Sequence, residues 1–200
     1  MESDRFVSLD IESPIWERVF VVAPLVVVGT KEGEEYNLAP KHMAMPLGWE
    51  NYFGFICTPA HGTYHNAKRY GNFTVSYPWP DKITVASLTA SPRKEGSGKE
   101  QPIMDQLPTT PATIVDGIFL SDAYLMLECE LDRVVDGFGE QSLIVGRIIA
   151  FHVHEDALRT SDREDQRLIY DAPHLAYLHP GRYATIRETQ AFPFPAHFKS

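Results

Sequence analysis

The sequence predicts a mainly β fold, a closed or nearly closed antiparallel barrel with a few short helices. Three observations predict it. Strand-like segments outnumber helical ones, no strand–helix–strand alternation occurs, and the clearest hydrophobic periodicity has a period of two. Closing the barrel would also remove exposed sheet edges. With 44% hydrophobic and 22% charged residues, the 200-residue chain can build a real core, and we expect a single domain over residues 1–200.

Three strands are expected in the first half of the chain. Each is a run of apolar, aromatic or β-branched residues that ends near Gly or Pro, which interrupt strands. They cover the apolar run at 25–29, the aromatic segment NYFGFICTP at 51–59 and FTVSYP at 73–78. Between the first two lies YNLAPKHMAMP, residues 36–46, and its prolines predict a short loop.

A short helix is expected in HGTYHNAKRYGN, between the second and third strands. Thr63 is a hydroxyl residue suited to the N-cap, and Gly71 follows the last turn as a C-terminal signal. His61 and His65 are four residues apart, as two metal ligands on one helix face would be. However, no HExxH motif surrounds them, and Gly62 weakens the helix there. We therefore expect no metal site and interpret both as surface or phosphate-facing histidines.

The second half predicts a long antiparallel hairpin. In AYLMLECELDRV, apolar residues alternate with Glu128, Glu130 and Asp132, which indicates a half-exposed strand with its acids in water. The turn sequence DGFGEQ then leads into SLIVGRIIAFHVH, a strand that is apolar on both faces and so more deeply buried. Before this hairpin, residues 91–112 are rich in Gly, Ser, Pro and charge, and we expect a long surface loop there.

Charge and composition exclude some classes of partner. The net charge of −9 would repel a phosphate-coated polymer, so nucleic acid is not expected as a partner. The start, MESDRFVSLDIE, lacks the features of a signal peptide, and the longest apolar run is about half a membrane span and contains Pro24. Cys57 and Cys129 lie in strand-like runs, and we interpret them as buried free thiols of a cytoplasmic protein, with a mutual disulfide or a redox role as alternatives.

Several motifs in one order resemble the flavin reductase-like family, the FMN-binding split β-barrel. The resemblance covers roughly residues 18–187 and rests on NLAPKH (Asn37, Ala39, His42), GTYHNAKRYGNFTVS (Thr63, Asn66, Gly71, Phe73, Val75), LIVGRIIAFHVHED (Val145, Gly146) and HLAYLHPGRYA (Gly181, Tyr183). It implies a six-stranded antiparallel Greek-key barrel, usually a homodimer, with one FMN per subunit near the dimer interface.

The resemblance also implies which residues bind the cofactor. The loop from Asn37 to Met43 would follow the isoalloxazine ring and ribityl chain, while Thr58 and Thr63 would hold the phosphate at a helix N-terminus. His42 stands where the family usually has Ser or Thr. Its imidazole could donate a hydrogen bond, attract phosphate as a cation, or displace the ring. The expected cofactor-binding residues are Asn37, Ala39, Lys41, His42, Met43, Thr58, His61, Thr63 and Asn66, the last of which either pins the local turn or touches the ligand.

The activity implied by the resemblance is that of an NAD(P)H-dependent flavin reductase, with NADH or NADPH as donor. Hydride transfer to flavin N5 needs no protein acid or base, so no catalytic residue is assigned. His152, His154 and Tyr183 are candidates for lining the nicotinamide side. A monooxygenase component would be the partner that receives reduced flavin. The alternatives are a flavoredoxin-like electron carrier that does not use NAD(P)H, and a non-catalytic barrel that has lost flavin because of His42.

Overall fold

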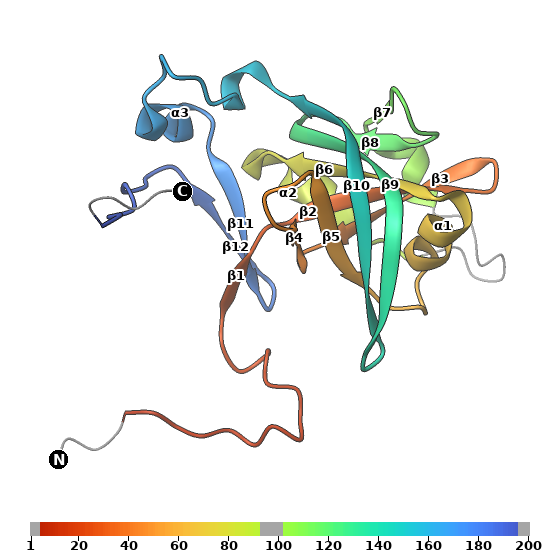
Figure 1. Cartoon of the computed structure of the whole chain (residues 1–200), viewed down its shortest axis with the longest axis horizontal. Helices are drawn as coiled ribbons and strands as arrows, with labels where there is room; N and C mark the ends of the chain where they lie inside the picture. The colour runs from red at the N-terminus through yellow and green to blue at the C-terminus, as the bar shows by residue number, and fades with distance from the viewer. Residues whose placement is uncertain (1–4, 93–101, 196–200) are drawn as a thin grey trace.

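The computed structural model of the chain describes residues 5–92 and 102–195, and its centre is a seven-stranded antiparallel sheet (Figure 1). The strand order is β3-β2-β6-β9-β10-β5-β4. The strands are β2 (Val26–Glu32), β3 (Glu35–Lys41), β4 (Ala44–Pro46), β5 (Tyr52–Cys57), β6 (Asn72–Pro78), β9 (Ala123–Phe138) and β10 (Gln141–Val153). The mainly β fold class is thus confirmed, with seven strands in the main sheet where six were expected.

The main sheet curls on itself because its two edge strands follow one another in the chain. Strand β3 at one edge and β4 at the other are joined only by His42 and Met43. Three Cα-to-Cα steps span at most about 11 Å, so the two edges must meet there. On the β4 side of this link, the Ile56 N–H donates to the Met43 carbonyl at 2.8 Å and so extends the β4–β5 pairing. We call residues 41–44, where the edges meet, the closing corner.

The prediction of a loop at residues 36–46 is wrong over most of that range. Residues 35–41 form β3 and pair with β2 from Glu35–Glu32 to Lys41–Val26. Pro40 fits this strand because β3 is a sheet edge with one neighbour, where a missing N–H is tolerated. Between β3 and β4, only His42 and Met43 lie outside a strand.

Both faces of the main sheet are covered by a hydrophobic core. Successive residues of β2 point to opposite faces, and Val26 and Val28 belong to the core inside the barrel, whereas Val27 belongs to the core outside it. The inner core is aromatic and tightly packed. A Cβ on Gly146 would lie 2.5 Å from the Phe73 ring, so only glycine lets β10 approach that ring.

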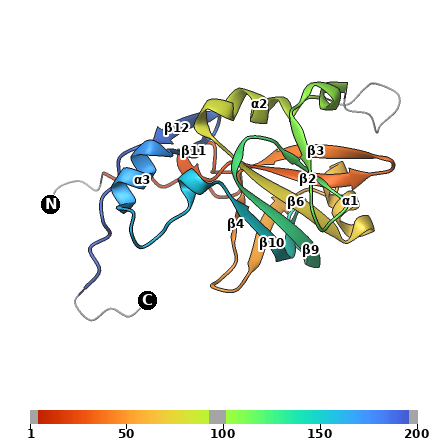
Figure 2. The ribbon, with the colours of Figure 1, turned by 90° about the horizontal axis from the view of Figure 1, so that it is seen from above.

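Helix α2 (Ile83–Leu88) and a two-stranded sheet of β7 (Thr109–Pro111) and β8 (Ile118–Leu120) cover the outer core (Figure 2). The long loop expected at 91–112 is only partly tested, because residues 93–101 lie outside the described residues. Its second half is not the irregular loop expected: the 3₁₀ turn η2 (Pro102–Gln106) and β7 occupy most of it. Leu107 between them is buried in the outer core, which explains why this part is ordered against the sheet.

A separate three-stranded sheet, which we call the terminal sheet, lies beside the barrel (Figure 1). Its strands are β1 (Val21–Ala23), β11 (His174–His179) and β12 (Arg182–Ile186). The remaining elements are α3 (Asp165–Asp171) and the 3₁₀ turns η1 (Pro80–Lys82) and η3 (Glu155–Ala157). The segments before β1 and after β12 form two extended arms. These arms carry exposed Phe6, Trp16, Phe20, Phe192 and Phe194.

Helix α1 (Gly62–Tyr70) occupies the expected place, but its first turn differs from expectation. Thr63 is not the N-cap. His61 is, without a side-chain capping bond, and Thr63 lies inside the helix and is buried. The C-terminal signal is confirmed, because Gly71 adopts a left-handed conformation with φ of 69°. Across the two described ranges, no helix is long and apolar enough to cross a lipid bilayer.

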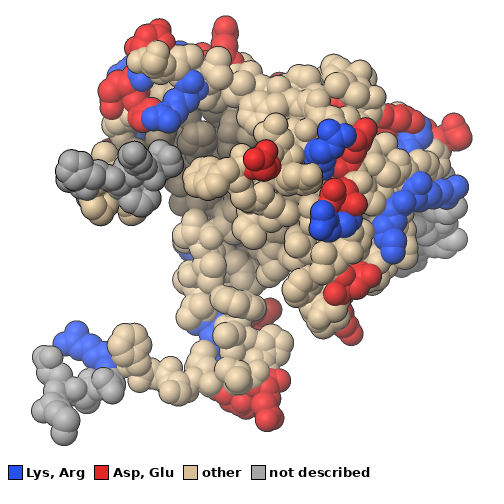
Figure 3. Space-filling model, in the orientation of Figure 1, with Lys and Arg blue, Asp and Glu red and all other residues tan. Residues whose placement is uncertain are grey.

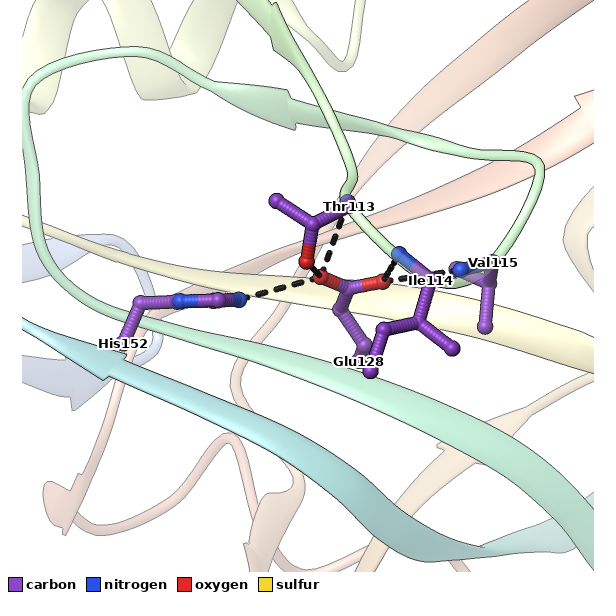
Figure 4. Close-up of polar contacts among 5 residues, drawn as sticks. All are labelled: Thr113, Ile114, Val115, Glu128 and His152. Carbon is purple, nitrogen blue, oxygen red and sulfur yellow. Dashed lines mark hydrogen bonds and ion pairs between the residues drawn. The ribbon is translucent and has the colours of Figure 1, made fainter.

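The acidic face expected on β9 is not wholly in water, because Glu128 is completely buried. The segment that connects β7 to β8 folds over this carboxylate (Figure 4). Oε1 accepts from the N–H and hydroxyl of Thr113 at 2.9 and 2.6 Å, and Oε2 accepts from the N–H groups of Ile114 and Val115 at 2.7 and 2.8 Å. His152 Nε2 lies 3.0 Å from Oε1. Burial opposes ionisation, but these hydrogen bonds outweigh it and lower the pKa of Glu128 to about 2.

We expect Glu128→Gln to destabilise the protein by about 3 kcal/mol at pH 7. The pKa of Glu128 lies near 2 when folded, against an ordinary 4.5. Its stabilising contribution is therefore complete above pH 4.5 and is lost as the pH falls towards 2. Urea unfolding of both proteins at several pH values checks this, and the difference should shrink on acidification.

Glu130→Gln is the matched control. Glu130 is on the same strand, but it is half-exposed and paired with Arg147, so its loss should cost less than about 1 kcal/mol. Equal effects of the two substitutions would show that the buried carboxylate has no special role.

Candidate functional site

A cleft of about 380 Å³ lies between β3, the N-terminus of α1 and the residues that follow α2. We call it the helix cleft. The first N–H groups of a helix have no partner within the helix, and they carry the positive end of its dipole, so this end favours anions. The helix cleft is lined by Asn37, Leu38, Ala39, Pro40, Lys41, Ala60, His61, Gly62, Thr63, Thr89, Ala90 and Ser91.

Two buried side-chain contacts fix α1 against the β2–β3 hairpin. The Thr63 hydroxyl donates to the Asn37 side-chain oxygen at 3.5 Å, inside the cleft wall. One turn later, Asn66 donates to the Thr30 hydroxyl at 3.2 Å. All four side chains are buried, so the helix is held by matched polar groups as well as by its apolar face.

A second cleft, of about 350 Å³, lies at the closing corner, and we call it the corner cleft. It shares Pro40, Lys41 and His61 with the helix cleft, so the two form one groove along β3. The corner cleft is lined by Pro40, Lys41, His42, Met43, Ile56, Cys57, Thr58, His61 and Gln141.

Among residues 5–92 and 102–195, no Asp or Glu side chain lines this groove. That is unusual for a chain with a net charge of −9. The groove instead presents Lys41, the imidazoles of His42 and His61, and hydroxyl groups such as Thr58 and Thr63. Such a set of donors suits an elongated ligand with a negatively charged group.

His42 is packed against the terminal sheet. Its ring stacks on His179 at 5.0 Å between centroids with an interplanar angle of 12°, and Tyr177 lies at 4.9 Å. Burial, followed by the nearby charges of His179 and Lys41, lowers the pKa of His42 below its ordinary value. The imidazole is therefore uncharged at neutral pH. Its Nε2 is buried and has no hydrogen-bond partner in the part of the chain that the structure describes.

Lys41 reaches from the edge strand to β5. Its Nζ donates to the sulfur of Cys57 at 3.6 Å. Cys57 and Cys129 are both free and buried, which confirms the prediction of buried unpaired thiols. Both belong to the inner core, and of the two only Cys57 also lines the groove.

With this geometry described, comparison with known proteins assigns the family. The sequence matches the flavin reductase like domain over residues 18–187, which is most of the chain. The chain belongs to this family. The resemblance predicted from the motifs is thus confirmed. No curated protein matches the sequence.

Several solved structures share the fold of this chain. Flavoredoxin from Methanosarcina acetivorans has 16% identity and a TM-score of 0.74, and the alignment covers 96% of this chain and 97% of that one. An FMN-binding protein from Thermus thermophilus with bound 1-cyclohex-2-enone has 22% identity and a TM-score of 0.72, with 96% and 99% covered. A homolog of nitrilotriacetate monooxygenase component B from Mycobacterium thermoresistibile has 12% identity and a TM-score of 0.68, with 90% and 89% covered.

The structure of this family member brings eight of the nine expected cofactor-binding residues to the groove. They are Asn37, Ala39, Lys41, His42, Met43, Thr58, His61 and Thr63. Asn66 does not line it and instead anchors α1 through Thr30. Sequence reasoning missed Thr89, Ser91 and Gln141, which also line the groove. These come from the end of α2 and the start of β10, and no motif in the sequence signals their convergence.

The three candidates for the nicotinamide side lie away from the groove. His152 contacts the buried Glu128. His154 and Tyr183 line a different cleft of about 560 Å³, whose wall includes Trp79 and which shares no lining residue with the groove. The structure therefore does not bring these three residues together.

We expect His42 to titrate below pH 6.5. His179→Asn should raise the pKa of His42, because it removes a neighbouring imidazole, but burial should keep the pKa below the ordinary value. Imidazole proton shifts followed by NMR over pH 4–8 measure both. His65→Asn, on the exposed side of α1, is the control and should leave the His42 titration unchanged. A His42 midpoint above 6.5 in the parent protein would contradict the buried, uncharged assignment.

Proposed function

We propose that the chain binds FMN in the groove and acts as a flavin reductase-like oxidoreductase that takes hydride from NADH or NADPH. The observation that carries this proposal is the groove itself, an elongated site that begins at a helix N-terminus, ends at the closing corner and has no carboxylate among its described lining residues. An anionic, elongated cofactor fits such a site, whereas the net charge of the rest of the chain would repel it.

The phosphate of FMN is placed at the helix cleft. Thr63 and the first N–H groups of α1 supply donors there, and Lys41 and His61 stand at the boundary between the two clefts. The Thr63 hydroxyl has a single proton, which it donates to Asn37 over a long 3.5 Å contact, so it would exchange this contact for a bond to the phosphate. A charge-assisted bond to an anion is stronger than one between neutral groups, so these contacts would contribute most of the polar binding energy.

The flavin ring is placed at the corner cleft. Met43 and Ile56 offer apolar surface, and the uncharged His42 offers a nitrogen that has no protein partner. His42 in this proposal replaces the family's hydroxyl as a neutral hydrogen-bonding group. Bound FMN supplies the hydride acceptor, while the protein binds it, orients it and limits water access.

A homodimer is part of the proposal, because the arms expose large apolar side chains. Phe6 is 91% exposed and Phe192 70%, and both arms extend from the terminal sheet away from the barrel (Figure 1). Exposed apolar patches of this kind mark interaction sites. On the face drawn in Figure 3, basic side chains alternate with acidic ones and form no continuous patch, so nucleic acid is not proposed as a partner. The unpaired thiols accord with a cytoplasmic location.

A second candidate function is a flavoredoxin-like carrier that receives electrons from a protein and does not use NAD(P)H. It is favoured by the likeness to flavoredoxin over nearly the whole length of both chains. A monooxygenase component as the acceptor of reduced flavin is favoured by the likeness to a monooxygenase component B homolog. The third alternative, a barrel that has lost flavin, would require His42 to fill the corner cleft. The structure does not favour it, because the cleft remains beside His42.

We expect the purified protein to show flavin absorbance bands after addition of FMN. Loss of these bands on addition of NADH or NADPH under nitrogen would support the reductase and identify the donor. Bands that persist with both nucleotides but are lost with a protein reductant would favour the carrier. Absence of any FMN-dependent change in absorbance or melting temperature would overturn the proposed function.

Thr63→Ala is expected to weaken FMN binding by about 1–3 kcal/mol, because it removes a donor to a charged group. Fluorescence titration with FMN measures the dissociation constant, and thermal unfolding without FMN separates binding from stability. Thr110→Ala, an exposed threonine on β7, is the matched control. Unchanged affinity in Thr63→Ala would place the phosphate elsewhere.

A further inference from the structure

The side chains of Lys41 and Cys57 form an amine–thiol pair inside the groove, in which the thiol also contacts the Thr58 carbonyl at 3.7 Å. They come from β3 and β5, strands that only the closing corner brings near each other. The Lys41 Nζ lies 3.6 Å from the Cys57 sulfur, and both residues line the corner cleft. Small solutes that enter this cleft therefore meet the thiol together with the amine.

The groups around Cys57 act on the pKa of its thiol in opposite directions. Burial raises the pKa of the thiol, whereas the charge of Lys41, its hydrogen bond and the N–H of Tyr64 in the first turn of α1 act to lower it. Cys129 shows the contrast. Both cysteines belong to the inner core, but Cys129 does not line the groove, and burial, followed by the charge of Glu128, raises its pKa to about 12. Of the two cysteines, only Cys57 has a cation beside it and a cleft in front of it.

We propose that Lys41 and Cys57 are a modification site, at which dioxygen links them through one oxygen atom into a reversible sulfur–oxygen–nitrogen bridge. An inserted oxygen makes up part of the 3.6 Å between the two atoms. A direct sulfur–nitrogen bond would instead require the strands to close that distance fully.

The step balances with dioxygen as the oxidant. Cys57 loses its S–H hydrogen, and the Lys41 ammonium loses one proton to solvent and one hydrogen to the reaction. One oxygen atom forms the S–O and O–N bonds, and the other leaves as water. Sulfur and nitrogen each lose two electrons, and dioxygen takes up the four. The product is about 14 Da heavier than the parent chain. Two dithiol molecules, each oxidised to a disulfide, supply the four electrons that restore both side chains and release the bridging oxygen as water.

The bridge would remove the positive charge of Lys41 from the groove. If FMN binds there, oxidation should weaken its binding several-fold, so the pair would act as an oxygen-sensitive control of cofactor affinity. This consequence rests on the proposed function, whereas the bridge itself does not.

The test is mass spectrometry of the full chain, prepared without FMN either under nitrogen with dithiothreitol or in air. Lys41 is the only tryptic site between Lys31 and Lys68. A bridged Lys41 resists trypsin, so the air-exposed protein should give peptide 32–68 uncut and about 14 Da heavier. Dithiothreitol should remove the added mass and restore cleavage into 32–41 and 42–68.

Cys57→Ser and Lys41→Arg should each abolish the added mass, and Cys129→Ser, the matched control, should retain it. Several results would overturn the proposal: no added mass in air, added mass that survives in Cys57→Ser, or oxygen on Cys57 with normal cleavage at Lys41. A loss of about 2 Da would also overturn it, since this marks a disulfide or a direct sulfur–nitrogen bond. Failure of both redox forms to bind FMN would overturn the proposed function but leave the bridge standing.

Discussion

The two-residue link between β3 and β4 is the constraint on which the rest of this structure depends. Because His42 and Met43 join strands at opposite edges of one sheet, the sheet has to curl until its edges meet. That single closure places Lys41 beside β5, turns His42 towards the terminal sheet and opens a groove along β3. The groove thus exists because two edge strands are directly linked in the chain. The side chains at the closing corner determine its chemistry.

The buried polar groups of Glu128 and His42 differ in how fully they are hydrogen-bonded. Glu128 is fully buried yet ionised, because four donors on one short segment and His152 satisfy its oxygens. This network is complete, and we regard it as structural. His42 is the opposite case, since it is uncharged and retains a buried nitrogen without a protein partner. An unmade hydrogen bond costs free energy, and such a cost is ordinarily tolerated where a ligand completes the site.

Sequence reasoning succeeded where the pattern was local and failed where tertiary contacts decided. The period-two alternation predicted β9, and Gly71 predicted the end of α1, because both signals arise within a few residues. Pro40 misled, since its tolerance depends on β3 being an edge strand, which only the sheet order reveals. The prediction that Glu128 lies in water was wrong for the same reason, because the segment that buries it lies more than ten residues earlier in the sequence. The groove residues were found through family motifs, yet Gln141 joins them from a distant strand.

The closing corner also has a consequence for the order of events during synthesis. Strand β5 pairs only with its neighbours β4 and β10, and Cys57 lies opposite Ser142, 85 residues further along the chain. Until β10 has left the ribosome, β5 therefore has no strand to pair with on the side away from β4. The contacts among Thr113, Glu128 and His152, by contrast, span a much shorter stretch of chain. Contacts that are close in sequence form at lower entropic cost, so we expect these contacts and the β2–β3 hairpin to form before β5 pairs with β10, and the ligand groove to be completed last.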